Sequence, residues 1–366
     1  MTTTPVALEY VARLAPYVPG KPIEDVAREL HLDPSTIVKL ASNENPRGPS
    51  PTVLAAIAAA AGEVTRYPDG FGYHLKDALA KRLSVTPAQL VLGNGSNDIL
   101  ELATMAYLRP GDAAVYSRHA FAVYPLATHA RGATGIEVPA RELGHDLAAM
   151  RSAITQQTRV LFVANPNNPT GTWIPPAELE AFVASIPRNV LVVLDEAYNE
   201  YLEPADRADS VAWIAKYPNL LVSRSFSKAY GLAALRIGYG VTSAEVADMM
   251  NRVRQPFNVN SLAQAAAVAA LADTAYVDES RAMNREGLSQ LYQGFEALGL
   301  RYVRSHGNFV LVKVGDAARI NTALLHKGVI VRPVASYALP EWLRVSVGLP
   351  GENDRFLAAL RESLGR

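Results

Sequence analysis

Between residues 88 and 241 the chain alternates short apolar, β-branched segments with segments whose apolar residues recur at helical spacing. Helices are predicted at 96–108 and 175–186. Seven strands are predicted in the same region, at 89–93, 112–117, 134–139, 159–166, 189–197, 219–225 and 236–241. Strands that are apolar throughout and alternate with helices are typical of a mostly parallel sheet covered by helices on both faces. The region therefore predicts an α/β domain with a doubly wound, seven-stranded sheet.

After residue 241 the pattern changes. Long helical segments fill 243–299, and three strands and a closing helix follow them, at 306–314, 328–333, 342–349 and 354–365. This order indicates a smaller α+β domain. The first 50 residues are rich in proline and glycine, which favours an arm packed on the rest of the chain. We expect a large domain over 51–265, and a small domain formed by 266–366 together with the arm, 1–50.

Composition excludes several classes of protein. The 366 residues include 35 basic and 35 acidic side chains, which argues against a nucleic-acid or anionic-membrane surface. There is no cysteine, so disulfides and thiolate chemistry are excluded, and a reducing cytoplasm is a compatible location. The N-terminal 20 residues lack the apolar core of a signal peptide, and the alanine-rich run 263–273 is too short to span a bilayer.

Polar residues follow several predicted strands at their carboxyl ends, where open α/β sheets bind ligands. In GNGSND (93–98), glycines and Ser96 lie between a strand and a helix N-terminus, an arrangement that favours a phosphate. A simple helix cap explains the same residues. In NPNNPTG (165–171), Asn168 is a candidate side-chain donor, although turn formation alone could account for it.

Two further strand ends contain residues of unusual chemistry. LDEAY (194–198) ends a fully apolar strand with Asp195, and Tyr198 follows; a buried carboxylate is costly unless it meets a cation or strong donors. A cap or an internal ion pair is the structural alternative. SFSK (225–228) places Lys228 among hydroxyls, with Arg236 eight residues later and no acidic residue between them. A buried turn that happens to contain a lysine is the alternative there.

Taken together, these strand ends favour one chemistry. The seven histidines are scattered, which disfavours a metal site, and no G-x-S-x-G motif indicates a serine hydrolase. A phosphate cradle, a buried acid and an amine free of acidic neighbours are what pyridoxal 5'-phosphate requires, because its aldehyde joins a lysine and its ring accepts electrons opposite an aspartate.

The ordered series of motifs resembles the fold type I pyridoxal-phosphate aminotransferases over nearly the whole chain. Within that group it is most similar to the histidinol-phosphate aminotransferase family, on the segments LAPYVPG, KLASNENPRGPSP, RYPDG, HAFAVYP, PFNVNSLAQAA, GVIVRP and LPEWLRVSVG. The resemblance implies an aspartate-aminotransferase-like fold and transfer of an amino group between L-histidinol phosphate and 2-oxoglutarate, in histidine biosynthesis. It also implies a homodimer with shared active sites.

The resemblance further assigns roles to residues. Lys228 is implied as the residue that binds the cofactor covalently and moves the proton, Asp195 as the partner of the pyridine nitrogen, and Tyr198 with Asn168 as donors to the ring oxygen. Phe121 is implied as the ring that stacks on the cofactor. The implied contacts of the cofactor phosphate are Gly95, Ser96, Asn97, Ser225, Ser227, Arg236 and, from the neighbouring subunit, Tyr67.

For the substrate, the resemblance implies that Arg344 binds the carboxylate of the amino-acid partner and the phosphate of histidinol phosphate. Arg332, Tyr17 and Asn43 are implied as further substrate contacts. Arg47 and the pair 97–98 depart from the commoner family residues, which leaves the substrate open. An aromatic amino-acid aminotransferase, a threonine-phosphate decarboxylase-like lyase and a cofactor-binding regulator remain as alternatives.

Overall fold

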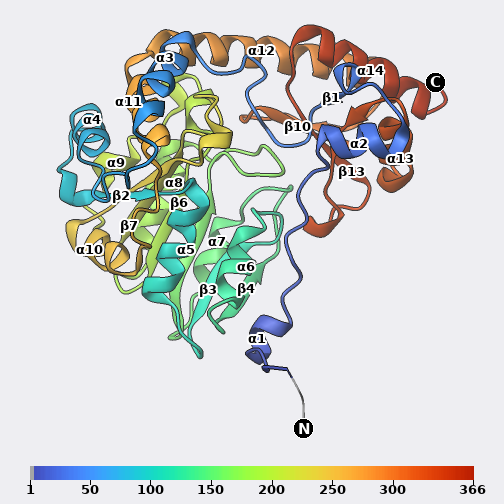
Figure 1. Ribbon diagram of the computed structural model, residues 1–366. Coiled ribbons are helices and arrows are strands. Elements are labelled where there is room, and N and C mark those ends of the chain that lie inside the picture. The colour runs from blue at the N-terminus through green and yellow to red at the C-terminus, as the bar shows by residue number, and fades with distance from the viewer. Residues whose placement is uncertain (1–3) are drawn as a thin grey trace.

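The computed structural model describes residues 4–366, and its larger part is built around a seven-stranded sheet (Figure 1). The strands lie in the order β2-β8-β7-β6-β5-β3-β4. Their bounds are β2 Leu90–Gly93, β3 Ala113–Ser117, β4 Thr134–Val138, β5 Thr158–Ala164, β6 Leu191–Asp195, β7 Leu220–Ser225 and β8 Gly238–Val241. Neighbouring strands are parallel except at β8, which is antiparallel to both β2 and β7. The seven predicted strands and the mostly parallel sheet are therefore confirmed.

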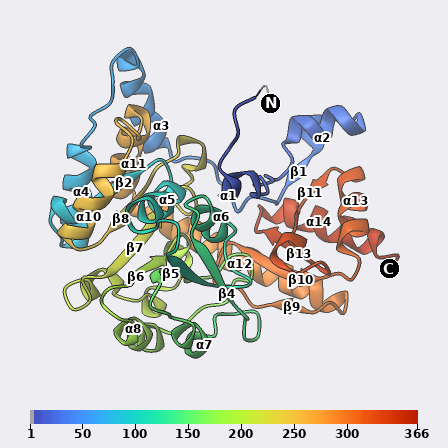
Figure 2. The ribbon, with the colours of Figure 1, turned by 90° about the horizontal axis from the view of Figure 1, so that it is seen from below.

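Helices cover both faces of this sheet, and each layer of helices has its own apolar core (Figure 2). One face packs against α5 (Ser96–Tyr107), α6 (Val123–His129) and α10 (Ala244–Val253). The helices that share a core with the other face are α3 (Pro51–Ala60), α4 (Tyr73–Leu83), α7 (Leu147–Ser152), α8 (Pro176–Ser185), α9 (Ser210–Trp213) and α11 (Ser261–Ala272). The near-continuous apolar character of the central strands follows from this two-sided burial.

The smaller part of the chain contains an antiparallel sheet in the order β12-β13-β10-β9. Its strands are β9 (Tyr302–Val303), β10 (Phe309–Lys313), β12 (Arg332–Pro333) and β13 (Trp342–Ser346), and α13 (Ala317–His326) and α14 (Pro350–Ser363) share its core. The strand predicted at 328–333 is divided. Its first half, β11 (Val329–Ile330), pairs with β1 (Val38–Lys39) of the N-terminal segment, whereas its second half, β12, pairs with β13 of the small sheet.

Helix α12 (Thr274–Ala297) connects the two parts (Figure 1). Its first turn, with Tyr276 and Val277, belongs to the core of the large sheet. Its later turns, with Leu291 and Phe295, belong to the core of the small sheet. A single 24-residue helix thus packs in both cores and limits how far the two parts can rotate against each other.

The N-terminal segment reaches from the large part to the small one. It contains α1 (Glu9–Ala12) and α2 (Ile23–Leu30). Tyr10 lies beside Gly132 and Pro110 of the large part, and Arg332 Nη2 on β12 donates to the Val18 carbonyl at 2.7 Å. Among residues 4–366 no helix is both long and apolar enough to cross a bilayer.

Candidate active site

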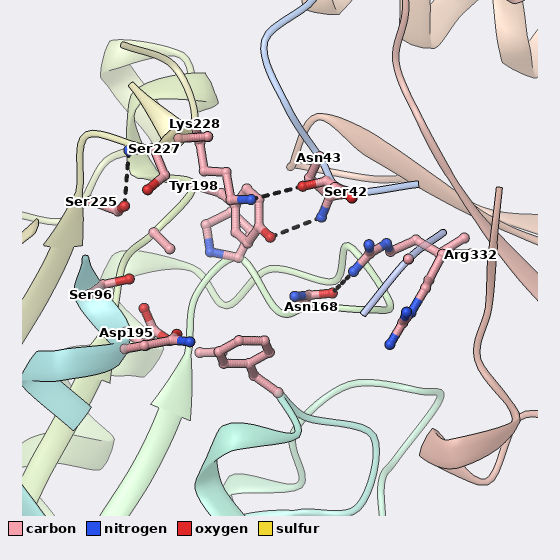
Figure 3. Close-up of a pocket in the computed structure, with 18 of the residues that line it drawn as sticks. Ser42, Asn43, Ser96, Asn168, Asp195, Tyr198, Ser225, Ser227, Lys228 and Arg332 are labelled. Carbon is pink, nitrogen blue, oxygen red and sulfur yellow. Dashed lines mark hydrogen bonds between the residues drawn. The ribbon is translucent and has the colours of Figure 1, made fainter. Parts of the chain in front are cut away.

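A pocket lies at the carboxyl ends of β5, β6 and β7, between the large sheet and strand β13 of the small one (Figure 3). Fourteen of the residues predicted from the sequence line it: Tyr17, Asn43, Ser96, Asn97, Phe121, Asn168, Asp195, Tyr198, Ser225, Ser227, Lys228, Arg236, Arg332 and Arg344. Gly95 lies directly behind this lining, against Arg236. Tyr67 does not line the pocket of its own chain.

Lys228 lies in the turn that follows β7. The Ser227 N–H donates to Ser225 Oγ at 3.0 Å, and the fully buried Phe226 points into the core, so that the residues on either side of it face the pocket. Lys228 Nζ donates to the Ser42 carbonyl at 3.0 Å. Burial, helped by the nearby Arg344 charge, lowers the pKa of Lys228 from 10.5 to about 8. The turn therefore holds an amine that loses its proton far more readily than a surface lysine.

Asp195 is the last residue of β6 and its carboxylate is buried. The Tyr124 hydroxyl donates to Oδ2 at 2.9 Å, and Oδ1 has no partner among residues 4–366. Burial raises the pKa of Asp195 to about 6, against the Tyr124 bond, which lowers it. A buried carboxylate oxygen without a partner is costly, so the position favours a ligand with an N–H donor or a positive charge.

The N-terminus of α5, a 12-residue helix, faces the pocket together with Arg236. Gly95 precedes this helix at φ +84°, and a Cβ there would collide with the Arg236 guanidinium. Arg236 Nη1 donates to Ser227 Oγ at 3.3 Å, and none of the ion pairs in the described part of the chain includes Arg236. Free backbone N–H groups, hydroxyls and an arginine without a carboxylate partner form a site for a phosphate-like anion.

Arg344 on β13 is buried and points toward the loop that follows β5. Its Nη1 donates to Asn168 Oδ1 and its Nη2 to the Ala41 carbonyl, both at 2.6 Å. Nε has no partner among the described residues, and burial lowers the pKa of Arg344 from its usual value. Because Asn168 Oδ1 accepts from Arg344, the Asn168 amide nitrogen is directed into the pocket as a donor (Figure 3).

Arg332, Tyr17 and Phe121 complete the pocket. The Arg332 guanidinium lies 5.5 Å from the centre of the Tyr17 ring, a cation–π contact between β12 and the N-terminal segment. The Phe121 ring meets Tyr124 edge to face at 6.0 Å. One side of the pocket therefore presents an aromatic ring, and another presents the two arginines of the small sheet.

Tyr67 is 82% exposed and stacks on Phe257 with 4.7 Å between ring centres. Phe71, in the loop before α4, and Tyr73, the first residue of α4, are 80% and 68% exposed. Large aromatic side chains gathered on one exposed segment are typical of a protein–protein contact.

Sequence reasoning missed two residues that hold the predicted ones. Tyr124, which bonds Asp195, lies three residues after Phe121 within HAFAVYP, and Ser42, whose carbonyl accepts from Lys228, lies within KLASNENP. Both residues lie in motifs that were recognised in the sequence, so these motifs could have pointed to them. Among residues 4–366, no cluster of three or more histidine, aspartate or glutamate side chains is arranged to ligate a metal.

Comparisons with known proteins agree with this geometry. Residues 35–360 match the family model of class I and II aminotransferases. The chain is 61% identical over 355 residues to histidinol-phosphate aminotransferase 1 of Thiobacillus denitrificans, covering 97% of this chain and 92% of that protein. It is also 61% identical over 355 residues to histidinol-phosphate aminotransferase 2 of Pseudomonas aeruginosa, covering 97% and 96%.

Solved structures agree as well. The crystal structure of histidinol-phosphate aminotransferase from Sinorhizobium meliloti in complex with pyridoxal-5'-phosphate superposes with a TM-score of 0.90 at 30% identity, covering 98% of this chain and 97% of that one. Aspartate aminotransferase from Thermus thermophilus with maleate gives a TM-score of 0.83 at 27% identity, covering 99% and 98%. The chain belongs to the class I and II aminotransferase family and, within it, to the histidinol-phosphate aminotransferases.

Proposed function

We propose that this protein transfers an amino group between L-histidinol phosphate and 2-oxoglutarate with pyridoxal 5'-phosphate, as a step of histidine biosynthesis. The observation that supports the reaction is the combination found in one pocket: the amine of Lys228, the unpartnered Oδ1 of Asp195 and the anion site at Arg236. The names of the relatives support the substrate.

The residues present fit the cofactor. Asp195 Oδ1 offers the missing acceptor for a protonated pyridine nitrogen, and Phe121 offers a ring face. Tyr198 and the Asn168 amide nitrogen are donors for the ring oxygen. Gly95, Ser96, Asn97, Ser225, Ser227 and Arg236 would hold the phosphate. When bound, the cofactor supplies an aldehyde that joins amines and a ring that accepts electrons.

Lys228 has two tasks in the proposal. Its Nζ would bind the cofactor covalently in the resting enzyme. Once freed by the substrate amine, it would take the proton from the substrate carbon that bears the nitrogen and deliver it to the cofactor carbon. With a pKa of about 8, roughly a tenth of this amine is neutral at pH 7, compared with less than about a thousandth for an ordinary lysine. Asp195 would hold its negative charge toward the ring nitrogen of the bound cofactor.

The small sheet would bind the substrates. Arg344 offers a planar pair of donors for a carboxylate, and Arg332 with Tyr17 lies where a second anionic group, such as the substrate phosphate, can be reached. Donor and acceptor would use the same pocket in turn, which predicts ping-pong kinetics.

We further propose a homodimer in which Tyr67 contacts the cofactor phosphate of the partner subunit. The exposure of Tyr67, Phe71 and Tyr73 supports this. In mixed dimers of Lys228→Ala and Tyr67→Ala chains, one site has both substitutions and the other has neither. Recovery of activity on mixing two inactive variants supports a shared site, whereas no recovery rejects it.

The proposal also includes a large domain over 51–265 and a small one formed by 1–50 and 266–366. The two sheets have separate apolar cores, but α11 and the first turn of α12, which extend beyond residue 265, pack in the core of the large sheet. A cytoplasmic location is part of the proposal, since the cysteine-free chain needs no oxidising compartment.

The decisive test combines labelling and an assay panel. Borohydride reduction should fix the cofactor to Lys228, which peptide mass spectrometry detects; labelling elsewhere or nowhere would refute the assignment. Histidinol phosphate, phenylalanine and tyrosine are then compared as donors to 2-oxoglutarate. Turnover of phenylalanine without histidinol phosphate would reassign the protein to aromatic substrates. Release of carbon dioxide without a keto acid would indicate a lyase.

A further inference from the structure

Asn43 lies in the segment between β1 and α3, beside Tyr198 (Figure 3). It is 1% exposed and both ends of its amide are bonded within the protein. Nδ2 donates to the Tyr198 hydroxyl oxygen at 2.9 Å, and Oδ1 accepts from Ser346 Oγ at 3.0 Å. The orientation of the amide is therefore fixed at both ends without any ligand.

The backbone of Asn43 is held as firmly as its side chain. Its N–H donates to Ser346 Oγ at 2.8 Å, and Asn308 Nδ2 donates to its carbonyl at 3.0 Å. Ser346 ends β13 and Asn308 precedes β10, so both anchors belong to the small sheet. The φ of Asn43 is +54°, a left-handed conformation that asparagine tolerates better than most side chains.

This arrangement determines where the Tyr198 proton can go. A phenol donates one hydrogen bond, and here its oxygen already accepts one from Asn43 Nδ2. The hydroxyl proton of Tyr198 is therefore available to another acceptor. Because Tyr198 lines the pocket, a bound ligand can be that acceptor. The Asn43 bond also lowers the pKa of Tyr198, against burial, which raises it to about 12. A more acidic O–H is a stronger donor.

We propose that Asn43 is a positioning residue that holds the Tyr198 hydroxyl so that its proton is donated to the ring oxygen of the bound cofactor. This role rests on the proposed function and differs from the substrate contact implied by the family resemblance. Donation to the ring oxygen stabilises its negative form, which exists when the cofactor–Lys228 linkage has lost its proton. Asn43 thereby lowers the pH at which that proton is lost.

The test is a spectrophotometric pH titration of the visible absorption band of the cofactor-loaded enzyme. Asn43→Gly removes the amide and suits a φ of +54°. Its titration midpoint should rise by about half to one pH unit, as expected for one weakened hydrogen bond. Tyr198→Phe should raise the midpoint at least as much, and Asn43→Gly added to Tyr198→Phe should cause no further shift, because both act through the same hydroxyl.

Asn353→Ala is the matched control. Asn353 is a fully buried amide that bonds the Gly348 backbone and Gln290, and it lies outside the pocket. It should lower stability and leave the midpoint unchanged. If Asn43→Gly does not fold, Asn43→Asp replaces it. That carboxylate would accept the hydrogen bond of the Tyr198 hydroxyl, which would then point away from the cofactor, and should likewise raise the midpoint.

Three results would overturn the inference: an unchanged midpoint in the Asn43 variants, an added shift in the Tyr198→Phe background, or an equal shift in Asn353→Ala. Failure of the wild-type protein to form a visible band at all would instead refute the proposed function on which the inference rests, so the two failures are distinguishable.

Discussion

Lys228→Met should stabilise the cofactor-free protein near neutral pH. Folding lowers the pKa of this lysine from 10.5 to about 8, chiefly by burial. When folding lowers the pKa of an amine, the free energy of unfolding is highest above the pKa of the unfolded chain. It decreases as the pH falls from that value through the pKa of the folded protein. As the pH falls from 10.5 to 8, the free energy of unfolding of the wild-type protein therefore decreases by about 3 kcal/mol, at about 1.4 kcal/mol per pKa unit. The decrease persists at pH 7.

Methionine cannot be charged, so it avoids this loss, but it leaves the Ser42 carbonyl without its donor, which costs about 1 kcal/mol. The net expectation is a variant more stable by about 2 kcal/mol at pH 7, with the gain vanishing as the pH approaches 10. Urea unfolding of both cofactor-free proteins, at one protein concentration and at several pH values from 7 upward, measures the difference and avoids the range in which Asp195 titrates.

Lys313→Met is the control, because the Lys313 ammonium pairs with Glu341 at 3.0 Å on the surface. It should not reproduce the pH-dependent gain. A wild-type protein that is the more stable of the pair at pH 7, or a difference that does not change with pH, would refute the reasoning that burial of this amine opposes folding.

Three further outcomes are expected. Arg344→Ala should raise the KM for 2-oxoglutarate and for the amino donor about 100-fold or more, by loss of a two-point charged contact, and Arg344→Lys should not restore it; cofactor occupancy, read from absorbance, should stay near wild type. Gly95→Ala should weaken cofactor binding at least about tenfold in an absorbance titration, since φ is +84° and the new Cβ meets Arg236; Gly62→Ala, in open space, should not. Tyr124→Phe should raise the pKa of Asp195 further, because the variant lacks the hydrogen bond that lowers this pKa. With decreasing pH, the cofactor affinity of this variant should therefore fall more steeply than that of the wild-type protein.

The parts of the fold that could be predicted are those with a sharp sequence contrast. The central strands of the large sheet, such as β5 and β6, are apolar runs bounded by glycine, proline or polar residues, and such runs are recognisable without a partner. Helix α3 was not predicted. It is dominated by alanine, which is compatible with core and surface alike, so its sequence shows little of the apolar periodicity that marks an amphipathic helix.

The candidate site divides in a similar way. Lys228, Asp195 and Arg236 could be singled out because an amine, a carboxylate or a guanidinium is unusual at the end of a buried strand or in an apolar turn. Tyr124 could not, since a tyrosine in a helix is ordinary, and its bond to Asp195 depends on how α6 packs on the sheet. The contacts of Asn43 connect residues about 155 and 303 positions apart, and no local pattern encodes such pairings.

Several charged groups in the pocket destabilise the cofactor-free protein. Asp195 and Arg344 are buried and Lys228 is partly buried, none with an oppositely charged side chain in contact, and desolvation shifts the pKa of each toward its neutral form. An empty pocket of this kind is destabilising, and a ligand that brings a positive ring nitrogen to Asp195 and anions to Arg236 and Arg344 would remove most of the cost. Tight retention of the cofactor and increased stability on binding it are then two consequences of one arrangement of charges.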